Sequence, residues 1–182
     1  RGVTRDGGNG TLRRIRGLAY DASLGIMYGM TREGDLVRVN PWSGATIYLN
    51  FSLPSVPQTF WSSLAFDENT RRLYTANAFG NHELAEIVLT QDGLGVASHS
   101  FVGSTAFMGT PLHILGLDFY PSSAPPVPLT SDGIHAKAGV LYGSNRNNSN
   151  IVTLSTGNAA VTFTFGSQTM NVNNPQEIAF HP

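Results

Sequence analysis

The chain has 182 residues, which is enough for one domain with a hydrophobic core and short for two. Eleven basic and twelve acidic residues leave a net charge of −1, so no global field would attract nucleic acid or an anionic membrane surface. Charged residues make up only 13% of the sequence, glycine and proline number 20 and 10, and cysteine is absent. This composition favours an all-β protein over a helical bundle, and it excludes disulfides and thiolate metal sites.

The first predicted strands lie between residues 11 and 55. Gly17-Leu18-Ala19-Tyr20-Asp21 alternates large and small residues with the period of two that is typical of a strand. Three further short strands are predicted at 26–29, 36–39 and 46–49, and the turn Asn40-Pro41-Trp42-Ser43-Gly44 separates the last two. Because such turns join antiparallel strands, this region predicts one four-stranded antiparallel unit.

The same order of strands recurs about every 50 residues along the chain. The segments that match the first strand are Ser63-Leu64-Ala65-Phe66-Asp67, Gly116-Leu117-Asp118-Phe119-Tyr120 and Glu177-Ile178-Ala179-Phe180-His181. Later strands of these units are predicted at 73–77, 85–89 and 97–101, and at 141–145, 151–154 and 161–165. Repeated groups of four short strands are typical of β-propeller blades. A β-sandwich, the main alternative, gives no reason for the same motifs to repeat in the same order.

We therefore expect an all-β chain of β-propeller blades, each with four antiparallel strands: about three blades and the first strand of a fourth. Residues 1–182 form a single, incomplete propeller domain in this interpretation. The expected blades occupy about 11–55, 56–107 and 108–172, and the next blade starts at 173–182. The apolar residues of the four inner strands, with Tyr28, Tyr74 and Tyr142, are expected to be buried between blades. The proline-rich segment 121–137 is expected to be an irregular loop that docks a partner or a neighbouring blade.

Three segments resemble the YVTN-type propeller repeat: Leu73-Tyr74-Thr75-Ala76-Asn77, Leu141-Tyr142-Gly143-Ser144-Asn145 and Ile151-Val152-Thr153-Leu154-Ser155-Thr156-Gly157. The resemblance covers residues 17 to about 165, and in the first unit Thr31 stands where the repeat has asparagine. It implies a YVTN-type or quinoprotein-like bacterial or archaeal β-propeller repeat protein, secreted and located outside the cell or in the periplasm. Propellers of this kind include adhesive or scaffold modules and sugar-lactone or lyase enzymes, so the resemblance supports fold more than function.

The sequence contains none of the compact catalytic or metal motifs. There is no HExxH or GxSxG, and no two histidines stand at metal-ligand spacing, so catalytic residues stay unassigned and neither a metal nor a cofactor is expected. Asp21 and Asp67 recur at the end of a predicted strand, where we interpret them as turn residues that accept local backbone hydrogen bonds. No apolar run is long enough to predict a membrane-spanning helix.

The candidate binding site is predicted from the repeat. In a propeller, the loop before each inner strand and the loop between the second and third strands share one face, at the mouth of the central channel. These loops carry amides, which suit hydroxyl groups, and rings, which suit stacking against a carbohydrate or a peptide. The candidate ligand-binding residues are Arg14, Phe60, Trp61, Asn77, His82, His113, Asn145, Arg146 and Asn174.

Carboxylates are few in the same loops, where only Glu33, Glu83 and Glu177 occur. A metal-dependent active site should gather more of them. The sequence therefore predicts a non-catalytic, exported propeller module for binding or assembly, through contact with a protein or a carbohydrate. Its expected partners are another protein or copies of itself that complete the propeller. The alternative is a propeller-type enzyme, a metal-dependent lactonase or lyase, with its site at the channel mouth.

Overall fold

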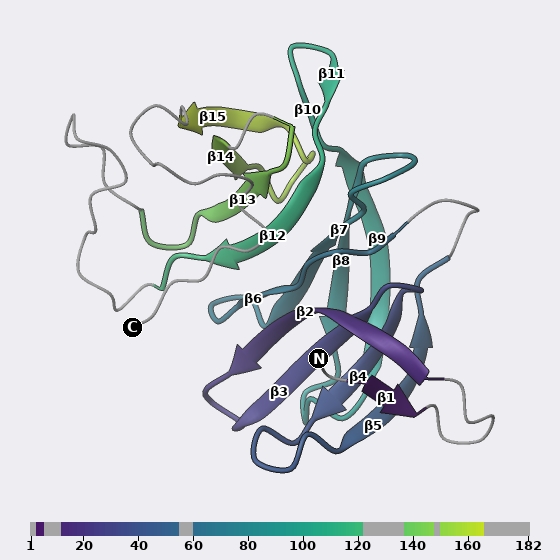
Figure 1. The fold of residues 1–182 in the computed structure, drawn as a ribbon. Coiled ribbons are helices and arrows are strands. Elements are labelled where there is room, and N and C mark those ends of the chain that lie inside the picture. Colours follow the sequence, from purple (N-terminus) through teal and green to yellow (C-terminus); the bar gives the residue numbers. More distant parts are fainter. Residues whose placement is uncertain (1–2, 6–11, 55–59, 122–136, 148–149, 166–182) are drawn as a thin grey trace.

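The structure is a computed structural model that describes residues 3–5, 12–54, 60–121, 137–147 and 150–165 (Figure 1). Every regular element within these residues is a β-strand, which confirms the predicted all-β class. In this part of the chain there is accordingly no helix with the length and hydropathy that crossing a membrane requires. The predicted strand at 177–180, most of the proline-rich segment 121–137 and Asn174 lie outside the described residues.

The first sheet has five antiparallel strands in chain order, one more than the sequence analysis predicts. They are β1 (Val3–Arg5), β2 (Leu12–Asp21), β3 (Ile26–Thr31), β4 (Asp35–Val39) and β5 (Thr46–Ser52). The unpredicted strand β1 pairs with the first residues of β2, so that Val3 lies opposite Arg14. Its three residues are too few to show a period of two in the sequence.

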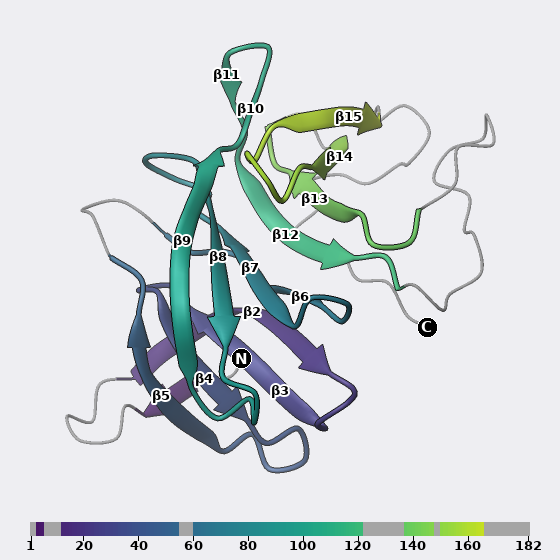
Figure 2. The ribbon, with the colours of Figure 1, turned by 180° about the vertical axis from the view of Figure 1, so that it is seen from behind.

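The second and third sheets each have four antiparallel strands in chain order, as predicted. The second contains β6 (Ala65–Asp67), β7 (Arg72–Ala76), β8 (Glu83–Leu89) and β9 (Val96–Ser104). The third contains β12 (Ile114–Phe119), β13 (Leu141–Asn145), β14 (Asn150–Leu154) and β15 (Val161–Phe165). A small unpredicted hairpin of β10 (Ala106–Phe107) and β11 (Thr110–Pro111) stands between them (Figures 1 and 2).

The innermost strands β2, β6 and β12 are neighbours, because β6 contacts both of the others. Strand β6 is shorter than predicted, because regular pairing with β7 begins only at Ala65. Before that residue, Ser63 bonds to the second strand through its hydroxyl and its backbone carbonyl. The Ser63 hydroxyl accepts a hydrogen bond from the Ala76 backbone nitrogen at 3.2 Å, and its carbonyl accepts one from the Thr75 hydroxyl at 2.6 Å. Inner strands β2 and β12 show register shifts at Ile15/Gly17 and Ile114/Gly116. The innermost pairing is thus irregular in all three sheets.

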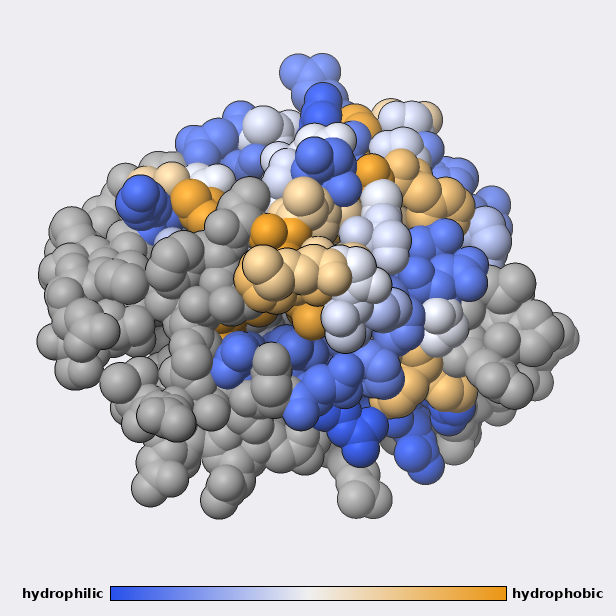
Figure 3. Space-filling model, turned by 90° about the horizontal axis from the view of Figure 1, so that it is seen from above, coloured by the Kyte–Doolittle hydropathy of each residue, from blue (hydrophilic) through white to orange (hydrophobic). Residues whose placement is uncertain are grey.

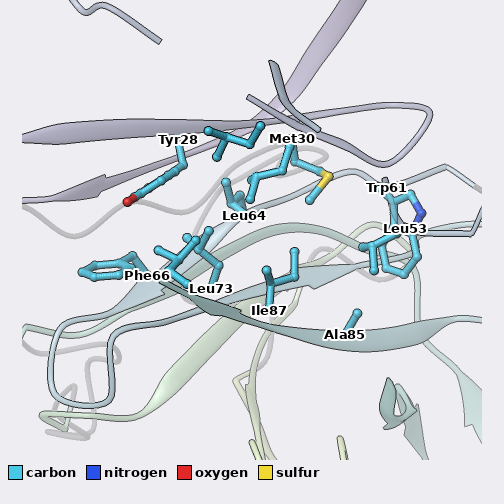
Figure 4. Close-up of a cluster of buried hydrophobic side chains, with 12 residues drawn as sticks. Tyr28, Met30, Leu53, Trp61, Leu64, Phe66, Leu73, Ala85 and Ile87 are labelled. Carbon is cyan, nitrogen blue, oxygen red and sulfur yellow. The ribbon is translucent and has the colours of Figure 1, made fainter. Parts of the chain in front are cut away.

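Two layers of apolar side chains hold the three sheets together. The layer between the first and second sheets includes Tyr28, Met30, Trp61, Leu73 and Ile87, all at most 1% exposed (Figure 4). The layer between the second and third sheets includes Tyr74, Leu84, Ile114, Leu117, Phe119, Leu141 and Val152. The second sheet is therefore covered on both faces, as the alternation of its strands requires.

The expectation that all apolar residues of the inner strands are buried is wrong for the first sheet. Tyr28, Tyr74 and Tyr142 are at most 3% exposed, as predicted, but Leu18 is 49% and Tyr20 is 50% exposed. On the same strand, Gly17 and Ala19 face the second sheet. Because neighbouring residues of a strand point to opposite faces, Leu18 and Tyr20 belong to the face turned away from that sheet.

Gly17 marks the closest approach between the first two sheets. A Cβ atom on Gly17 would overlap the carbonyl carbon of Ser63 and the backbone nitrogen of Leu64. The overlapping atoms are backbone and cannot move aside like a flexible side chain. The inner strands therefore meet backbone against backbone at this point, which requires glycine.

The turns that follow the inner strands β2 and β6 form what we call the turn end of the sheets. Asp21 is fully buried, and its Oδ1 accepts hydrogen bonds from the backbone nitrogens of Ser23 and Leu24 at 2.9 and 3.2 Å. Asp67 Oδ1 likewise accepts a bond from the Asn69 nitrogen at 2.9 Å. These contacts confirm the interpretation of both aspartates as turn residues.

An ion pair joins the first two sheets at the turn end. Arg71 of the β6–β7 turn places Nη2 2.8 Å from Asp21 Oδ2, and its Nη1 donates to the Ser23 hydroxyl at 2.6 Å. Arg71 has a positive φ of 58°, in the turn position that Gly25 (φ 66°) and Gly139 (φ 71°) hold in the other sheets. A left-handed conformation costs a non-glycine residue about 1–2 kcal/mol. The side chain of Arg71 compensates by neutralising a buried carboxylate.

Candidate functional site

The loops at the other end of the sheets converge as the repeat predicts, and we call this the mouth end. The same backbone hydrogen bond closes each sheet there and joins the segment before the inner strand to the loop between the next two strands. The three bonds run from the nitrogens of Arg32, Ala78 and Arg146 to the carbonyl oxygens of Arg14, Phe60 and His113, at 3.0, 3.1 and 2.9 Å. Residues far apart in the sequence are thereby held on one surface.

Three of the predicted ligand residues are part of the framework of these loops. Trp61, Asn77 and Asn145 are each only 1% exposed. Asn77 Oδ1 accepts a hydrogen bond from the Phe79 backbone nitrogen at 3.1 Å, and Asn145 Oδ1 accepts one from the His113 nitrogen at 3.2 Å. The asparagine of the repeat therefore holds the loop in shape. Asn77 bonds within its own loop, and Asn145 bonds both within its loop and across to the segment before β12.

Thr31 takes over the role of the asparagine in the first sheet. Its hydroxyl oxygen accepts a hydrogen bond from the Asp35 backbone nitrogen at 3.0 Å, and its hydroxyl donates to Asp35 Oδ2 at 3.1 Å. Both residues are buried. The departure of the first unit from the repeat pattern is thus compensated by a threonine–aspartate pair that stabilises the β3–β4 loop.

Aromatic and cationic side chains form a continuous band across the mouth end. We call this band the mouth cluster; it consists of Arg32, Phe60, Phe79, His82, His113 and Arg146. The Arg32 guanidinium carbon lies 3.5 Å from the centre of the Phe60 ring, and the Phe60 and Phe79 rings meet edge to face at 5.8 Å. Phe79 also meets His113 edge to face at 5.2 Å, and His113 lies 4.6 Å from His82. The Arg146 guanidinium carbon is 5.8 Å from the centre of the Phe79 ring.

All three sheets contribute to the mouth cluster. Arg32 comes from the β3–β4 loop of the first sheet, and Arg146 follows β13 in the third. Phe60, Phe79 and His82 belong to the second sheet, and His113 immediately precedes β12. Among the nine predicted residues, Phe60, His82, His113 and Arg146 are in this cluster. Arg14 is exposed at the start of β2, where its carbonyl holds the Arg32 backbone.

Phe79 is the cluster residue that the sequence analysis misses. It is followed by Gly80 in a loop and belongs to no strand pattern. Its ring contacts those of Phe60 and His113 and faces the Arg146 guanidinium, so it lies at the centre of the cluster. An aromatic residue two positions after the repeat asparagine is the signal that could have identified it.

The β10–β11 hairpin is attached to the mouth cluster through His82. The Thr105 backbone nitrogen donates to the His82 carbonyl at 2.6 Å, and the Leu112 nitrogen donates to the Thr105 carbonyl at 2.9 Å. His82 Nδ1 lies 3.2 Å from the Leu112 carbonyl oxygen. Met108 at the tip of the hairpin is 90% exposed. Figure 3, which views the molecule from above this hairpin, shows apolar side chains gathered in the middle of the face with hydrophilic ones around them.

Positive groups dominate the electrostatics of the mouth cluster. Partial burial lowers the pKa of His113, and the nearby positive charges of His82 and Arg146 lower it further. Glu33 follows Arg32 in the sequence and is exposed, and the Glu83 carboxylate accepts a hydrogen bond from Asn81 at 3.4 Å. Among the described residues the recorded ion pairs are those of Arg71 and Arg72, which lie outside the cluster.

The described part of the chain contains no group of three or more His, Cys, Asp or Glu side chains that could hold a metal ion. The two histidines of the cluster pack ring against ring at 4.6 Å, and Nδ1 of His82 already faces a backbone carbonyl. The chemistry available at the mouth end is therefore that of guanidinium donors, imidazoles and aromatic faces.

No protein-family model and no curated protein matches this sequence. Solved structures do share its fold. A chain of the nidogen–laminin complex is similar with a TM-score of 0.55 and 16% identity, over 91% of this chain and 52% of that one. The luciferin-regenerating enzyme is similar with a TM-score of 0.58 and 12% identity, over 91% of this chain and 49% of that one. The Cps50 (Swd1) β-propeller domain of Myceliophteria thermophila is similar with a TM-score of 0.53 and 12% identity, over 86% and 45%.

These similarities show the fold, because identities this low carry no functional assignment. The three sheets are β-propeller blades, each of which contains four antiparallel strands in chain order. The chain spans about half the length of the propeller chains that it matches.

Proposed function

We propose that this chain is a non-catalytic propeller module that binds a protein or a carbohydrate through the mouth cluster. The observation that carries the proposal is the band of rings and guanidinium groups that crosses all three blades. The two hydrophobic layers that hold the blades together do not include Phe60 or Phe79. Phe60, Phe79 and Arg32 are partly exposed, and aromatic residues and arginines are the residue types that dominate binding energy at interfaces.

The backbone of His82 supports the same proposal. His82 has a positive φ of 52°, a conformation in which glycine is the residue of lowest cost. A histidine at such a position retains a side chain at the expense of stability, and this pattern is typical of functional sites. The His82 ring packs against His113 and thereby extends the cluster towards the β10–β11 hairpin.

A binding screen with paired variants tests the proposed function. Wild-type protein, Phe79→Ala and Phe101→Ala would be applied to arrays of extracellular proteins and of glycans. Phe101 is a matched control, because it is a partly exposed aromatic residue on β9 that packs on Trp61 outside the cluster. We expect a ligand whose affinity falls about tenfold or more in Phe79→Ala and is retained in Phe101→Ala. Ligands that bind all three proteins equally would contradict the proposal.

The second candidate function is a propeller-type enzyme, a metal-dependent lactonase or lyase with its site at the same mouth. The observation that favours it is the pair of His82 and His113 rings, 4.6 Å apart at the mouth, because histidine is the side chain most often used as a general base. Hydrolysis of a panel of lactones with added divalent ions, by wild type and by His113→Asn, distinguishes the two functions. Turnover that needs His113 would replace the binding proposal.

We further propose that another blade covers the free face of the first sheet. This face exposes Leu18 and Tyr20 by about half, whereas the equivalent apolar residues of the second sheet are buried. The blade would come from more of the same chain, from a second copy or from a protein partner that completes the propeller. Light scattering of wild type and of Leu18→Glu tests this proposal for the isolated chain. Association that Leu18→Glu abolishes supports self-completion, and a stable monomer with cooperative unfolding contradicts it.

The location of the protein is also a proposal, and it rests on the resemblance to YVTN-type repeats. We propose that the protein is exported and acts outside the cell or in the periplasm. Fractionation of the source cells, followed by immunodetection, tests this directly. Recovery in the medium or the periplasmic fraction supports export, and recovery with cytoplasmic markers contradicts it.

A further inference from the structure

We propose that the mouth cluster binds an extended acidic segment of a partner protein, with carboxylates of that segment on Arg32 and Arg146. This inference rests on the proposed function and specifies the ligand of the same site. Four features of the site support it: the faces of the phenyl rings, the balance of charge, the spacing of the arginines and the position of the hairpin.

Arg32 covers ring surface that a neutral sugar would need. At 3.5 Å from the centre of the ring, the Arg32 guanidinium covers one face of Phe60. Phe79 contacts Phe60 and His113 through edge-to-face packing and faces Arg146. A guanidinium stacked on a ring still presents its N–H groups at the edge, in the geometry that matches a carboxylate. No side-chain hydrogen bond is recorded for Arg32 or Arg146 within the described residues, so these donors are available.

The charge of the cluster points to a ligand of negative sign. Arg146 lies in one group with His82 and His113; partial burial lowers the pKa of His113, and the charges of His82 and Arg146 lower it further. The nearby carboxylates of Glu33 and Glu83 form no ion pair with the cluster among the described residues. The net charge of the chain is only −1, so this local excess of positive charge is a property of the site. Carboxylates of a partner would relieve the repulsion.

The spacing of the arginines favours an extended peptide over a single small anion. Both phenyl rings lie between Arg32 and Arg146, and the centres of those rings alone are 5.8 Å apart. Residues that alternate along one side of an extended chain are about 6.6–6.8 Å apart. The contacts link Arg32 to Arg146 through two rings, so an extended segment with acidic side chains along one side can follow the band from one guanidinium group to the other.

The β10–β11 hairpin favours a protein partner over an acidic polysaccharide. Its tip exposes Met108 at 90%, and its base is bonded to His82 through Thr105. An exposed methionine beside a charged site offers an adaptable apolar contact, which a protein surface can use and a uronate chain cannot. The segment would lie across the cluster, and the rest of the partner would contact the hairpin.

Fluorescence anisotropy with a labelled peptide of four Glu-Ser repeats tests the proposal. The control peptide carries Gln in place of Glu. We expect the glutamate peptide to bind about tenfold or more tightly than the glutamine peptide, and to lose about tenfold in affinity in Arg32→Gln and in Arg146→Gln. Arg72→Gln removes the same charge at an exposed site away from the cluster and should keep the affinity.

A second readout locates binding at the cluster independently of affinity. In the free protein the pKa of His113 lies below its ordinary value, so a bound carboxylate should raise it. An NMR titration of the His113 ring with and without the glutamate peptide measures this change. His82→Gly, which keeps the backbone conformation, should weaken binding without lowering the melting temperature.

Three outcomes would overturn the proposal. Equal affinity for the glutamate and glutamine peptides would show that the site does not recognise the negative charge of its ligand. An oligogalacturonate of equal charge that binds more tightly, with the same dependence on Arg32 and Arg146, would assign the site to an acidic carbohydrate. A neutral ligand that requires Phe79 and leaves the glutamate peptide unbound would refute the acidic segment and keep the proposed binding function. Failure of the proposed binding function would give a different result, because in that case no ligand would lose affinity in Phe79→Ala.

Discussion

The two ends of the blades use arginine in opposite ways. At the turn end, Arg71 pairs with the fully buried carboxylate of Asp21 and joins the first two blades. At the mouth end, Arg32 and Arg146 lie over phenyl rings, and no described carboxylate pairs with them. Removing one partner of a buried ion pair destabilises a fold because it leaves the other charge uncompensated, whereas an unpaired charge on an aromatic surface is available to a ligand. We therefore expect changes at the turn end to alter stability and changes at the mouth end to alter binding.

The largest expected effect is the loss of the Asp21 carboxylate. Asp21→Ala leaves the backbone nitrogens of Ser23 and Leu24 without their acceptor and leaves Arg71 without its ion-pair partner. We expect the free energy of unfolding to fall by about 3 kcal/mol, as measured by urea denaturation. Asp92→Ala, in the exposed β8–β9 turn, is the matched control and should have a much smaller effect. Equal losses in the two variants would contradict the special role of the turn end.

Alkaline pH should destabilise the chain through its buried tyrosines. Burial raises the pKa of Tyr142 as well, and the largest shifts are those of Tyr28 and Tyr74. Burial raises the pKa of Tyr28 and Tyr74 to about 12, and nearby carboxylates contribute to both shifts. Between pH 10 and 12 the unfolded chain loses these protons while the folded chain keeps them. Stability therefore falls as the pH rises, by at most about 1.4 kcal/mol per pH unit for each tyrosine.

Urea denaturation at pH 9, 10 and 11 measures this slope. Tyr28→Phe should make it shallower, because the variant removes one of the groups that lose a proton in this range. At neutral pH the same variant should lose about 1 kcal/mol, since the Tyr28 hydroxyl donates to the Gly93 carbonyl at 3.0 Å. An unchanged slope in Tyr28→Phe would show that Tyr28 ionises equally in both states.

Acidic pH should lower the stability of the chain through His113 at the mouth end, by less than alkaline pH does through the tyrosines. The lowered pKa of His113 means that the folded chain binds this proton less readily than the unfolded chain does. Stability is therefore retained above the ordinary histidine pKa of about 6.5 and is lost as the pH falls below it. His113→Gln should flatten the dependence of melting temperature on pH between about 5 and 7. A steeper dependence of melting temperature on pH in the variant would contradict our inference that protonation of His113 destabilises the folded chain.

The smallest effect on stability is expected for the two mouth arginines. Arg32→Gln and Arg146→Gln each remove a cation from a ring that is partly open to solvent, a contact worth about 0.5–1 kcal/mol. We expect the free energy of unfolding to change by no more than that in either variant. Urea denaturation beside Asp21→Ala makes the comparison direct. A loss as large as that of Asp21→Ala would assign these arginines to the framework.

Alternation and turn residues were sufficient to predict the four strands that each blade has in common, and their order. Leu18 and Tyr20 show where such reasoning ends, because the period of two identifies two faces and does not say which of them another blade covers. Strand β1 and the β10–β11 hairpin were missed, since strands of two or three residues carry no period. The strands of each blade were therefore predictable from local patterns. Which face of the first sheet stays exposed depends on whether another blade lies against it, and local patterns do not specify that.

The mouth end was predictable as a place and less so as a set of contacts. The repeat brings the loops of Phe60, His82, His113 and Arg146 together, as expected. It does not give side-chain direction, so Asn77 and Asn145 were expected to face a ligand and instead bond to backbone groups of the mouth loops and of the segment before β12. Phe79 was missed for the same reason. Which side chain points outward depends on loop geometry that spacing in the sequence cannot supply.

The turn position shared by Gly25, Arg71 and Gly139 has a consequence for how the blades come apart. Only Arg71 has a side chain that can reach back to the aspartate of the preceding blade, and Gly139 leaves Asp67 with its local turn bonds. Repeat proteins unfold in units whose order follows the strength of each junction. We expect amide protons of β13 and β14 to exchange with deuterium before those of β3 and β7. The first two blades would then act as one cooperative unit, and the third would detach from it first.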